Sequence, residues 1–167
     1  AINWSTAYTN ILDQFTTCLD YSIVRRARLV PIYSRSNIVE QTLTSLEKTS
    51  GNHILLVGEE GSGRTEIFLS LAAKILSYES KTSFDGFQVR ILNSERLISS
   101  ARNNGEVINL TERIISDALK ASNVILYIDQ IERLIDPNQG DGHINIESVL
   151  GRYLNRPELR IIASTLP

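Results

Sequence analysis

The chain has 167 residues, of which 42% are hydrophobic and 22% charged, and its formal net charge is −2. This composition is that of one ordinary globular domain, and so small a net charge excludes the basic field that holds nucleic acid or an anionic membrane electrostatically. No apolar run approaches the roughly 20 residues that span a bilayer, and the amino terminus lacks a basic-then-apolar signal pattern. We therefore expect a cytoplasmic protein with neither nucleic acid nor membrane as its partner.

The first part of the chain is predicted to be a helical lead-in. Residues 9–30 and 36–48 carry apolar residues at helical spacing, and the stretch VPIYSRS, residues 30–36, forms a break between them. We predict no strand in this part. Cys18 is interpreted as a small core residue, because one cysteine forms no intrachain disulfide and two scattered histidines complete no zinc site.

After the lead-in, strand and helix patterns alternate. Short β-branched and leucine runs indicate strands that are buried on both faces, and longer segments with one apolar face indicate helices between them. Such an alternation predicts one parallel sheet with right-handed crossovers and helices on both faces. The strands are expected near residues 54–57, 88–92, 124–129 and 160–163, the helices at 64–76, 108–122 and 144–154, and loops at 77–86, 99–106 and 136–143.

Between the first of these strands and its helix lies GEEGSGRT, residues 58–65. Three glycines at this spacing let the backbone turn tightly and point amide hydrogens inward, while the helix adds its positive end, so the stretch predicts a phosphate loop. Its basic residue is Arg64, where such loops almost always carry lysine. The alternative is a glycine-rich turn that binds no ligand.

A metal site is expected beside this loop. The hydroxyl of Thr65 is placed to bind a magnesium ion that bridges terminal phosphates. Asp129 follows the most apolar strand of the chain, VILYI, where a parallel sheet would bring its carboxylate next to the loop. The alternative role for Asp129 is to cap a helix.

With these motifs in this order, the chain resembles a AAA+ ATPase, the first nucleotide-binding module of the Clp-type unfoldase and disaggregase chaperones, from Leu12 onward. Residues 12–35 resemble the lead-in of that family, whose Pro-hydrophobic-x-x-Arg portion packs on adenine. Residues 97–106 resemble its first pore loop, and residues 146–165 its helix and strand before the sensor position.

The resemblance implies an α/β P-loop NTPase fold, the AAA+ large subdomain, with a parallel sheet flanked by helices after a helical lead-in. It implies a lead-in over residues 1–28 and the nucleotide-binding subdomain over 29–167, with the family's fifth strand and helical lid falling beyond Pro167. ATP or ADP with Mg²⁺ is the implied cofactor. Other AAA+ subunits or modules in a ring, and a polypeptide substrate, are the implied partners.

The same resemblance assigns roles to individual residues. The nucleotide contacts, with GEEGSGRT as the Walker A loop, are Ile32, Tyr33, Gly58, Glu59, Glu60, Gly61, Ser62, Gly63, Arg64, Thr65 and Glu66. The metal residues are Thr65 and Asp129, the catalytic position is Gln130, the sensor is Thr165 or Ser164, and the pore loop holds Arg102, Asn103 and Asn104. Without the resemblance, the polar pair at 164–165 is equally well explained as turn chemistry.

Three positions depart from the family pattern. Arg64 stands in place of lysine, Gln130 in place of the catalytic glutamate, and Asn103 in place of a pore-loop aromatic residue. Because glutamine cannot take a proton from the attacking water, hydrolysis should fall by at least ~10²-fold. We expect weak nucleotide binding, with Arg64 paired to Asp129 in the empty loop. The alternatives are an active ATP-hydrolysing ring motor for protein remodelling and a non-catalytic structural or nucleotide-sensing scaffold.

Overall fold

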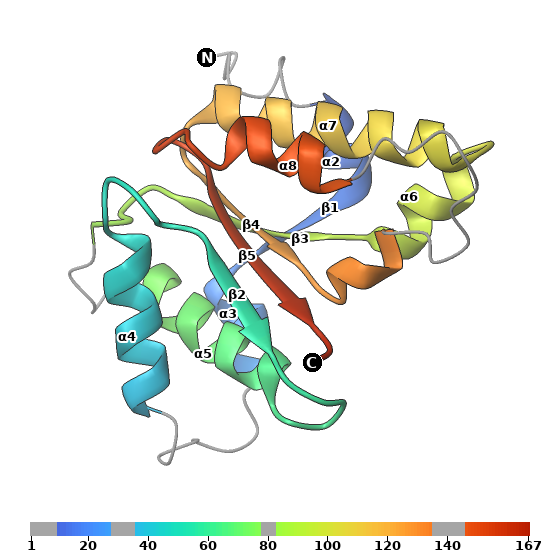
Figure 1. Ribbon diagram of the computed structural model, residues 1–167. Helices are drawn as coiled ribbons and strands as arrows, with labels where there is room; N and C mark the ends of the chain where they lie inside the picture. Colours follow the sequence, from blue (N-terminus) through green and yellow to red (C-terminus); the bar gives the residue numbers. More distant parts are fainter. Residues whose placement is uncertain (1–9, 28–35, 78–82, 135–145) are drawn as a thin grey trace.

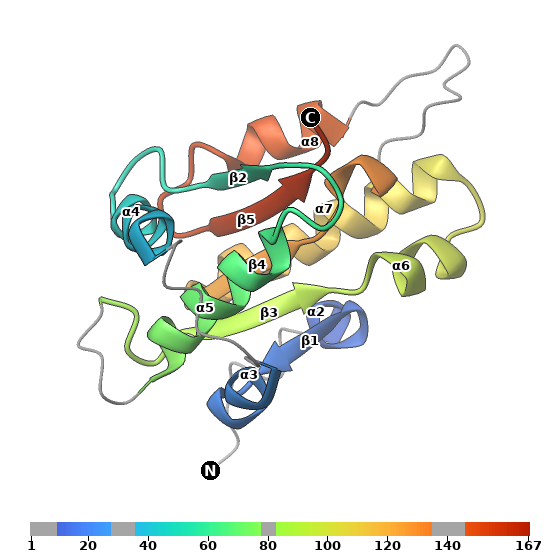
Figure 2. The same ribbon diagram turned by 90° about the horizontal axis from the view of Figure 1, so that it is seen from below.

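The computed structural model describes residues 10–27, 36–77, 83–134 and 146–167. At its centre lies a five-stranded sheet with the order β1-β3-β4-β5-β2. Figure 2 shows β1 and β2 at the opposite edges of this sheet. The strands are β1 (Thr16–Leu19), β2 (Ile54–Val57), β3 (Gln88–Leu92), β4 (Val124–Ile128) and β5 (Arg160–Thr165).

The four strands that the sequence predicts pair in parallel, β3 with β4, β4 with β5, and β5 with β2. The prediction of a parallel sheet flanked by helices is therefore confirmed. All five residues of β4 are buried, because this strand lies between two others and has helices over both faces. The carboxyl ends of the parallel strands lie at one edge of the sheet, next to the glycine-rich loop that follows β2.

The lead-in contains a strand, so the prediction of none there is wrong. β1 pairs antiparallel with β3, with Thr16 opposite Leu92. The Arg90 guanidinium supports this pairing, since it lies 3.1 Å from the Thr16 hydroxyl and 2.9 Å from the Asp13 carboxylate. Cys18 is exposed on this edge strand rather than in the core, which is a second correction.

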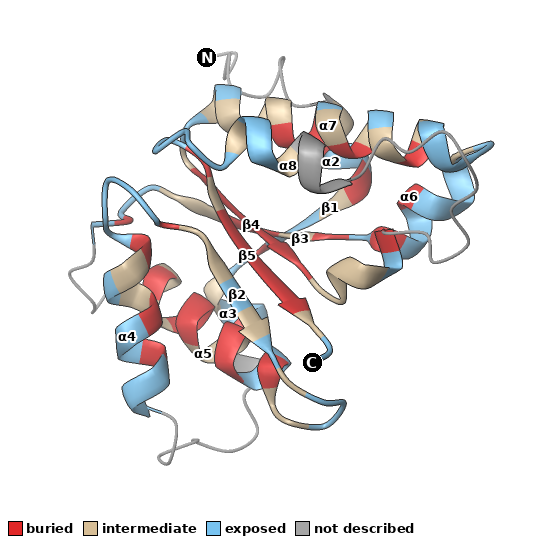
Figure 3. Ribbon diagram, viewed as in Figure 1, coloured by how far each residue is buried: buried red, intermediate tan, exposed pale blue. Residues whose placement is uncertain are grey.

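Helices cover both faces of the sheet (Figure 1). One layer packs over Val124, Leu126 and Ile128 of β4. The other layer packs over Ile125 and Tyr127, which lie on the opposite face of the same strand. Figure 3 shows that the sheet-facing sides of these helices are buried and their outer sides exposed. The first layer comprises α2 (Asn10–Phe15), α6 (Ser94–Ser100), α7 (Asn104–Ala121) and α8 (Ile146–Tyr153). The second comprises α3 (Tyr21–Ala27), α4 (Ser36–Leu46) and α5 (Arg64–Leu76).

The stretch SSARNNGE, predicted as a loop, is mostly helical. α6 extends to Ser100 and α7 already begins at Asn104, so only three residues separate the two helices. A 3-10 turn, η2 (Ile131–Leu134), follows β4. Among the described residues, no helix combines the length and the apolar character that a membrane crossing requires.

Candidate functional site

The glycine-rich loop joins the end of β2 to the start of α5, as the motif requires. Gly61 and Gly63 have φ angles of 76° and 87°, in the left-handed region that favours glycine. A Cβ atom on Gly58 would crowd the Ser62 hydroxyl, which would have to rotate away from it. Gly63 precedes α5 without a side-chain cap, which leaves the first amides of this helix to a ligand.

Arg64, the first residue of α5, is buried although it carries a permanent charge. Its side chain is 8% exposed, and its Nη1 atom has no hydrogen-bond partner. The predicted pair with Asp129 is wrong, because the ion pairs among the described residues do not join these two side chains. A buried guanidinium without an anion is costly, so the loop retains an unsatisfied cation that an anionic ligand would satisfy.

A cavity of about 230 Å³ opens beside this guanidinium. Sites for whole small molecules usually occupy about 300–1,000 Å³, so this cavity suits a phosphate chain rather than a complete nucleotide. Its lining combines the glycine-rich loop with the residues that follow β4. The lining residues are Glu60, Gly61, Ser62, Gly63, Arg64, Thr65, Glu66, Asp129 and Gln130.

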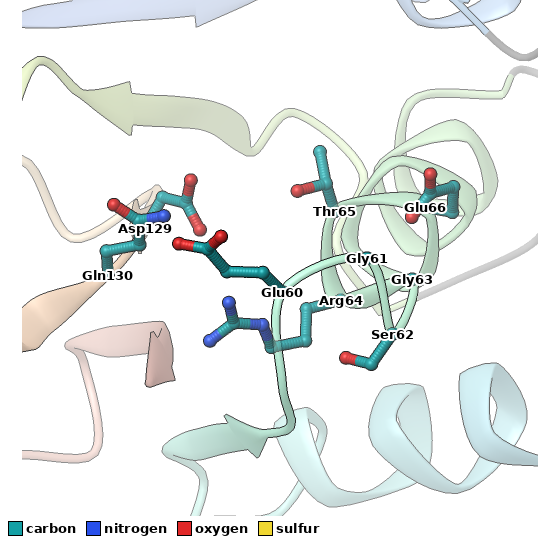
Figure 4. Close-up of a pocket in the computed structure, with 9 residues that line it drawn as sticks. All are labelled: Glu60, Gly61, Ser62, Gly63, Arg64, Thr65, Glu66, Asp129 and Gln130. Carbon is teal, nitrogen blue, oxygen red and sulfur yellow. The ribbon is translucent and has the colours of Figure 1, made fainter. Parts of the chain in front are cut away.

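Three carboxylates of the sequence prediction differ in their placement. Glu59 is exposed, and Glu66 is exposed in the first turn of α5. Glu60 is exposed as well, yet Figure 4 shows its carboxylate pointing across the cavity toward Asp129 and Gln130. The carboxylates of Glu60 and Asp129 therefore face the space where phosphates would bind. The positive charge of Arg64 offsets their repulsion of a phosphate.

Asp129 is held by a network of hydroxyl groups. Its Oδ1 atom accepts hydrogen bonds from the Tyr127 hydroxyl at 3.1 Å and from the Ser164 hydroxyl at 2.5 Å. Burial raises the pKa of Tyr127 to about 12, so this phenol stays protonated at working pH and remains a donor to Asp129.

Of the two sensor candidates, Ser164 contacts the site directly. It is fully buried, and besides donating to Asp129 it accepts a hydrogen bond from the Gln130 backbone N–H at 2.8 Å. Thr165 is partly exposed, and its carbonyl oxygen accepts from the Gly58 N–H at 3.2 Å. The carboxyl end of β5 is thus hydrogen-bonded both to the glycine-rich loop and to the backbone turn at Asp129 and Gln130.

Gln130 turns the backbone sharply after β4. Its φ angle is 49°, a conformation that residues other than glycine rarely adopt. The hydrogen bond to Ser164 supports this turn and directs the chain into η2. The Gln130 side chain reaches the cavity, where its carboxamide can donate and accept hydrogen bonds but cannot act as a base.

The donor chemistry at the cavity suits magnesium. Mg²⁺ prefers oxygen ligands and commonly binds through one or two protein groups together with substrate phosphates. The Thr65 hydroxyl and the Asp129 carboxylate point toward one another across the cavity (Figure 4). Among the described residues, no group of three or more histidine, cysteine or acidic side chains could hold a metal alone, so phosphate oxygens would have to complete the set.

A second cavity, of about 270 Å³, lies on the other side of Asp129 and Gln130. It is bounded by β1, by the end of β3 and by the start of α6, and the ion pair between Arg133 and Glu95, 3.5 Å long, stands at it. Sequence reasoning missed this cavity because it depends on β1. The Tyr127 network was also missed, although a tyrosine two residues before Asp129 shares its side of the strand.

The pore-loop candidates lie apart from the cavity, at the amino end of α7. The Asn103 side chain accepts a hydrogen bond from the Glu106 N–H, and the Glu106 carboxylate accepts one from the Arg102 N–H. This arrangement caps α7. Arg102, Asn103 and Asn104 are all exposed. The adenine-side candidates Ile32 and Tyr33 lie outside the described residues.

The fold has solved counterparts. The yeast structure titled S. cerevisiae Hsp104:casein complex, extended conformation, has a TM-score of 0.72 at 22% identity, covering 94% of this chain and 26% of that chain. The S. cerevisiae Hsp104–ADP complex has a TM-score of 0.71 at 23% identity, covering 93% of this chain and 21% of that chain. At these identities the likeness establishes the fold.

Curated relatives match nearly the whole chain. The chaperone protein ClpB of Oceanobacillus iheyensis is 27% identical over 161 residues, which are 96% of this chain and 20% of that protein. The ATP-dependent Clp protease ATP-binding subunit ClpA homolog of Cyanidium caldarium is 30% identical over 154 residues, 92% of this chain and 18% of that protein. The chain thus spans about a fifth of the length of these relatives. No family model matches it.

Proposed function

The chain is a homologue of the Clp-type AAA+ chaperones, and from this premise we propose that its loop binds ATP or ADP while hydrolysing ATP slowly or not at all. The relatives and the fold support a Clp-type AAA+ module. The proposal that catalysis is weak depends on Arg64 and Gln130.

The observation that carries the proposal is the unpartnered guanidinium of Arg64. It lies buried beside a helix amino end whose first amides have no side-chain cap, in a cavity of the size of a phosphate chain. A permanent charge is tolerated there only if an anion neutralises it for part of the time. Phosphate is the anion that a glycine-rich loop of this geometry accommodates.

Slow hydrolysis follows from Gln130. Its carboxamide reaches the cavity at the position where the family carries a glutamate base, and it cannot accept the proton of an attacking water. Arg64 adds a second handicap, because its planar fork is bulkier than an ammonium group and fits less well between two phosphates.

The wider role is proposed from the relatives. Such a module would assemble with other AAA+ subunits or modules in a ring and act on a polypeptide, with a lead-in over residues 1–28, a nucleotide-binding subdomain over residues 29–167 and a cytoplasmic setting. Because Asn103 caps α7 and offers little apolar grip, the scaffold or nucleotide-sensing role is favoured over active pulling.

Calorimetric titration with ADP and with ATP tests the binding site. The unaltered chain is expected to bind both weakly, Arg64→Lys to bind more tightly because an ammonium fits between phosphates, and Arg64→Met not to bind. Arg113→Met, which removes an exposed arginine from α7, is the matched control and should bind as the unaltered chain does. Equal affinity of the unaltered chain and Arg64→Met would contradict the proposed site.

Phosphate release tests the chemistry. We expect negligible release from the unaltered chain and from Gln130→Glu alone, and more release from Gln130→Glu combined with Arg64→Lys, since chemistry requires a positioned triphosphate first. Asn109→Asp adds the same charge on the exposed face of α7 and should have no effect. Brisk release from the unaltered chain would show an active motor module instead.

A further inference from the structure

Glu60 lies at the corner of a tight turn in the glycine-rich loop. The Ser62 N–H donates to the Glu59 carbonyl oxygen at 3.1 Å, and Gly61, at the third position of this turn, has a φ angle of 76°. A turn with a left-handed residue at that position also restricts the backbone of the residue before it. The main chain therefore sets the direction in which the Glu60 side chain leaves the loop.

That direction leads into the cavity. Glu60 lines it, and its carboxylate points toward Asp129 and Gln130 (Figure 4). The ion pairs in the described part of the chain do not include Glu60, so its charge is not neutralised by a direct partner. The side chain is also exposed, so water screens this charge in part.

The lining of the cavity carries more negative than positive charge near Asp129. Glu60 and Asp129 contribute carboxylates that face the cavity, whereas the carboxylate of Glu66 points away from Asp129 (Figure 4). Arg64 contributes the positive charge. It is 8% exposed and its Nη1 atom has no partner, so this side chain still requires an anion. The cavity can therefore attract a phosphate through Arg64, while further negative charge near the two carboxylates is repelled.

The two sides of the cavity act on different parts of a phosphate chain. The amides at the start of α5, which have no side-chain cap, favour phosphate on one side, and Asp129 and Gln130 form the other side. A chain of three phosphates reaches further toward that other side than a chain of two. Because Glu60 points in the same direction, its carboxylate acts most strongly on the phosphate that ATP has and ADP lacks.

We propose that Glu60 makes this loop prefer ADP to ATP, through repulsion between its carboxylate and the third phosphate. This inference rests on the proposed nucleotide site. ATP carries one more negative charge than ADP, whether or not each of them holds a magnesium ion. That extra charge is attracted by Arg64 but repelled by both Glu60 and Asp129, so the diphosphate is the better-matched ligand.

Calorimetric titration with ADP and with ATP, in one buffer with excess Mg²⁺, tests the preference. The unaltered chain should bind ADP about three- to tenfold more tightly than ATP, as expected for a charge repulsion near the surface that solvent screens in part. Glu60→Gln keeps the shape of the side chain and removes its charge. It should therefore bind ATP about three- to tenfold more tightly than the unaltered chain does, while its affinity for ADP changes by less than about twofold.

Three further variants make the comparison specific. Glu60→Ala removes the same charge together with the side chain and should strengthen ATP binding in the same way. Glu59→Gln removes a neighbouring exposed charge that does not line the cavity, so it should change the ratio of the two affinities less than Glu60→Gln does. Glu158→Gln is the control. It removes an exposed carboxylate just before β5, at the end of that strand away from the loop, and should leave both affinities unchanged.

The outcomes separate the preference from the site itself. If the unaltered chain binds ATP as tightly as ADP or more tightly, the inference is overturned and the nucleotide site stands. An unchanged ratio in Glu60→Gln and Glu60→Ala would also overturn it. So would an equal change of the ratio in Glu59→Gln, because the effect would then belong to the charge of the whole loop. If the unaltered chain binds neither nucleotide, the proposed site is refuted and the inference falls with it.

Discussion

Replacing Arg64 with methionine is expected to stabilise the empty protein and to abolish its anion site at the same time. Arg64 is 8% exposed, and one of its guanidinium nitrogens has no partner. Methionine keeps an unbranched side chain, which preserves the packing of the arginine stem near Gly58. It removes the charge and the unsatisfied donor together.

The magnitude follows from the unsatisfied group. A buried donor without a partner costs about 1–3 kcal/mol, and more when it is charged. Arg64→Met should therefore raise the free energy of unfolding of the empty chain by about 1–3 kcal/mol. Each kcal/mol corresponds to about 2–4 °C in melting temperature for a chain of this size. Conversely, ADP at 100 times its Kd should stabilise the unaltered chain by about 2.7 kcal/mol and the variant not at all.

Urea denaturation with and without ADP measures both effects. The control is Arg113→Met, whose exposed site on α7 should change stability by less than about 0.5 kcal/mol and leave the effect of ADP intact. A variant Arg64→Met that is less stable than the unaltered chain without ADP would refute the reasoning, because it would show that the guanidinium is satisfied in the empty protein.

Three further predictions concern the scaffold around the site. Burial lowers the pKa of His53 below its ordinary 6.5, and its Nδ1 accepts a hydrogen bond from the Ile161 N–H, so the protein should lose stability as the pH falls below 6.5. His53→Asn keeps an acceptor and should flatten this loss in urea titrations across pH, whereas an equally steep loss in that variant would count against the assignment. Arg90→Met should lower the free energy of unfolding by about 1.5–3 kcal/mol, because it removes the ion pair with Asp13. Hydrogen exchange should then become faster in β1 than in the rest of the sheet, and uniform acceleration would argue that Arg90 does not hold β1. Asn103→Ala should lower the free energy of unfolding by about 1 kcal/mol because it removes the cap of α7, whereas Asn103→Asp should retain most of it. Equal losses of stability in the two variants would contradict a capping role for Asn103.

The parts of the fold that the sequence predicts are those specified locally. Period and apolar content mark β4 and α5, since their buried faces follow from residues a few positions apart. The loop is equally readable, because Gly61 and Gly63 occupy backbone conformations that other residues avoid.

The features that could not be predicted from the sequence depend on contacts between residues far apart in the chain. TTCL of β1 is short and half polar, and only the exposed edge of β3 makes it a strand. The predicted Arg64–Asp129 pair failed for a similar reason. The alignment of β5 against β4 brings Ser164 to Asp129, so that the Oδ1 atom of this carboxylate accepts from Ser164 and Tyr127 rather than from the arginine.

The order of the strands also bears on how the chain can fold during synthesis. Of the strands in the described residues, the two that come first in the sequence, β1 and β2, lie at the edges of the sheet, and each pairs there with a single strand made much later. Arg90 follows its partner Thr16 by 74 residues, and Ile161 follows His53 by 108. Early strands must therefore wait unpaired, with Leu55 and Val57 of β2 still 57% and 59% exposed in the finished fold. Contacts so distant along the chain favour slow folding and give a chaperone time to bind the waiting edge.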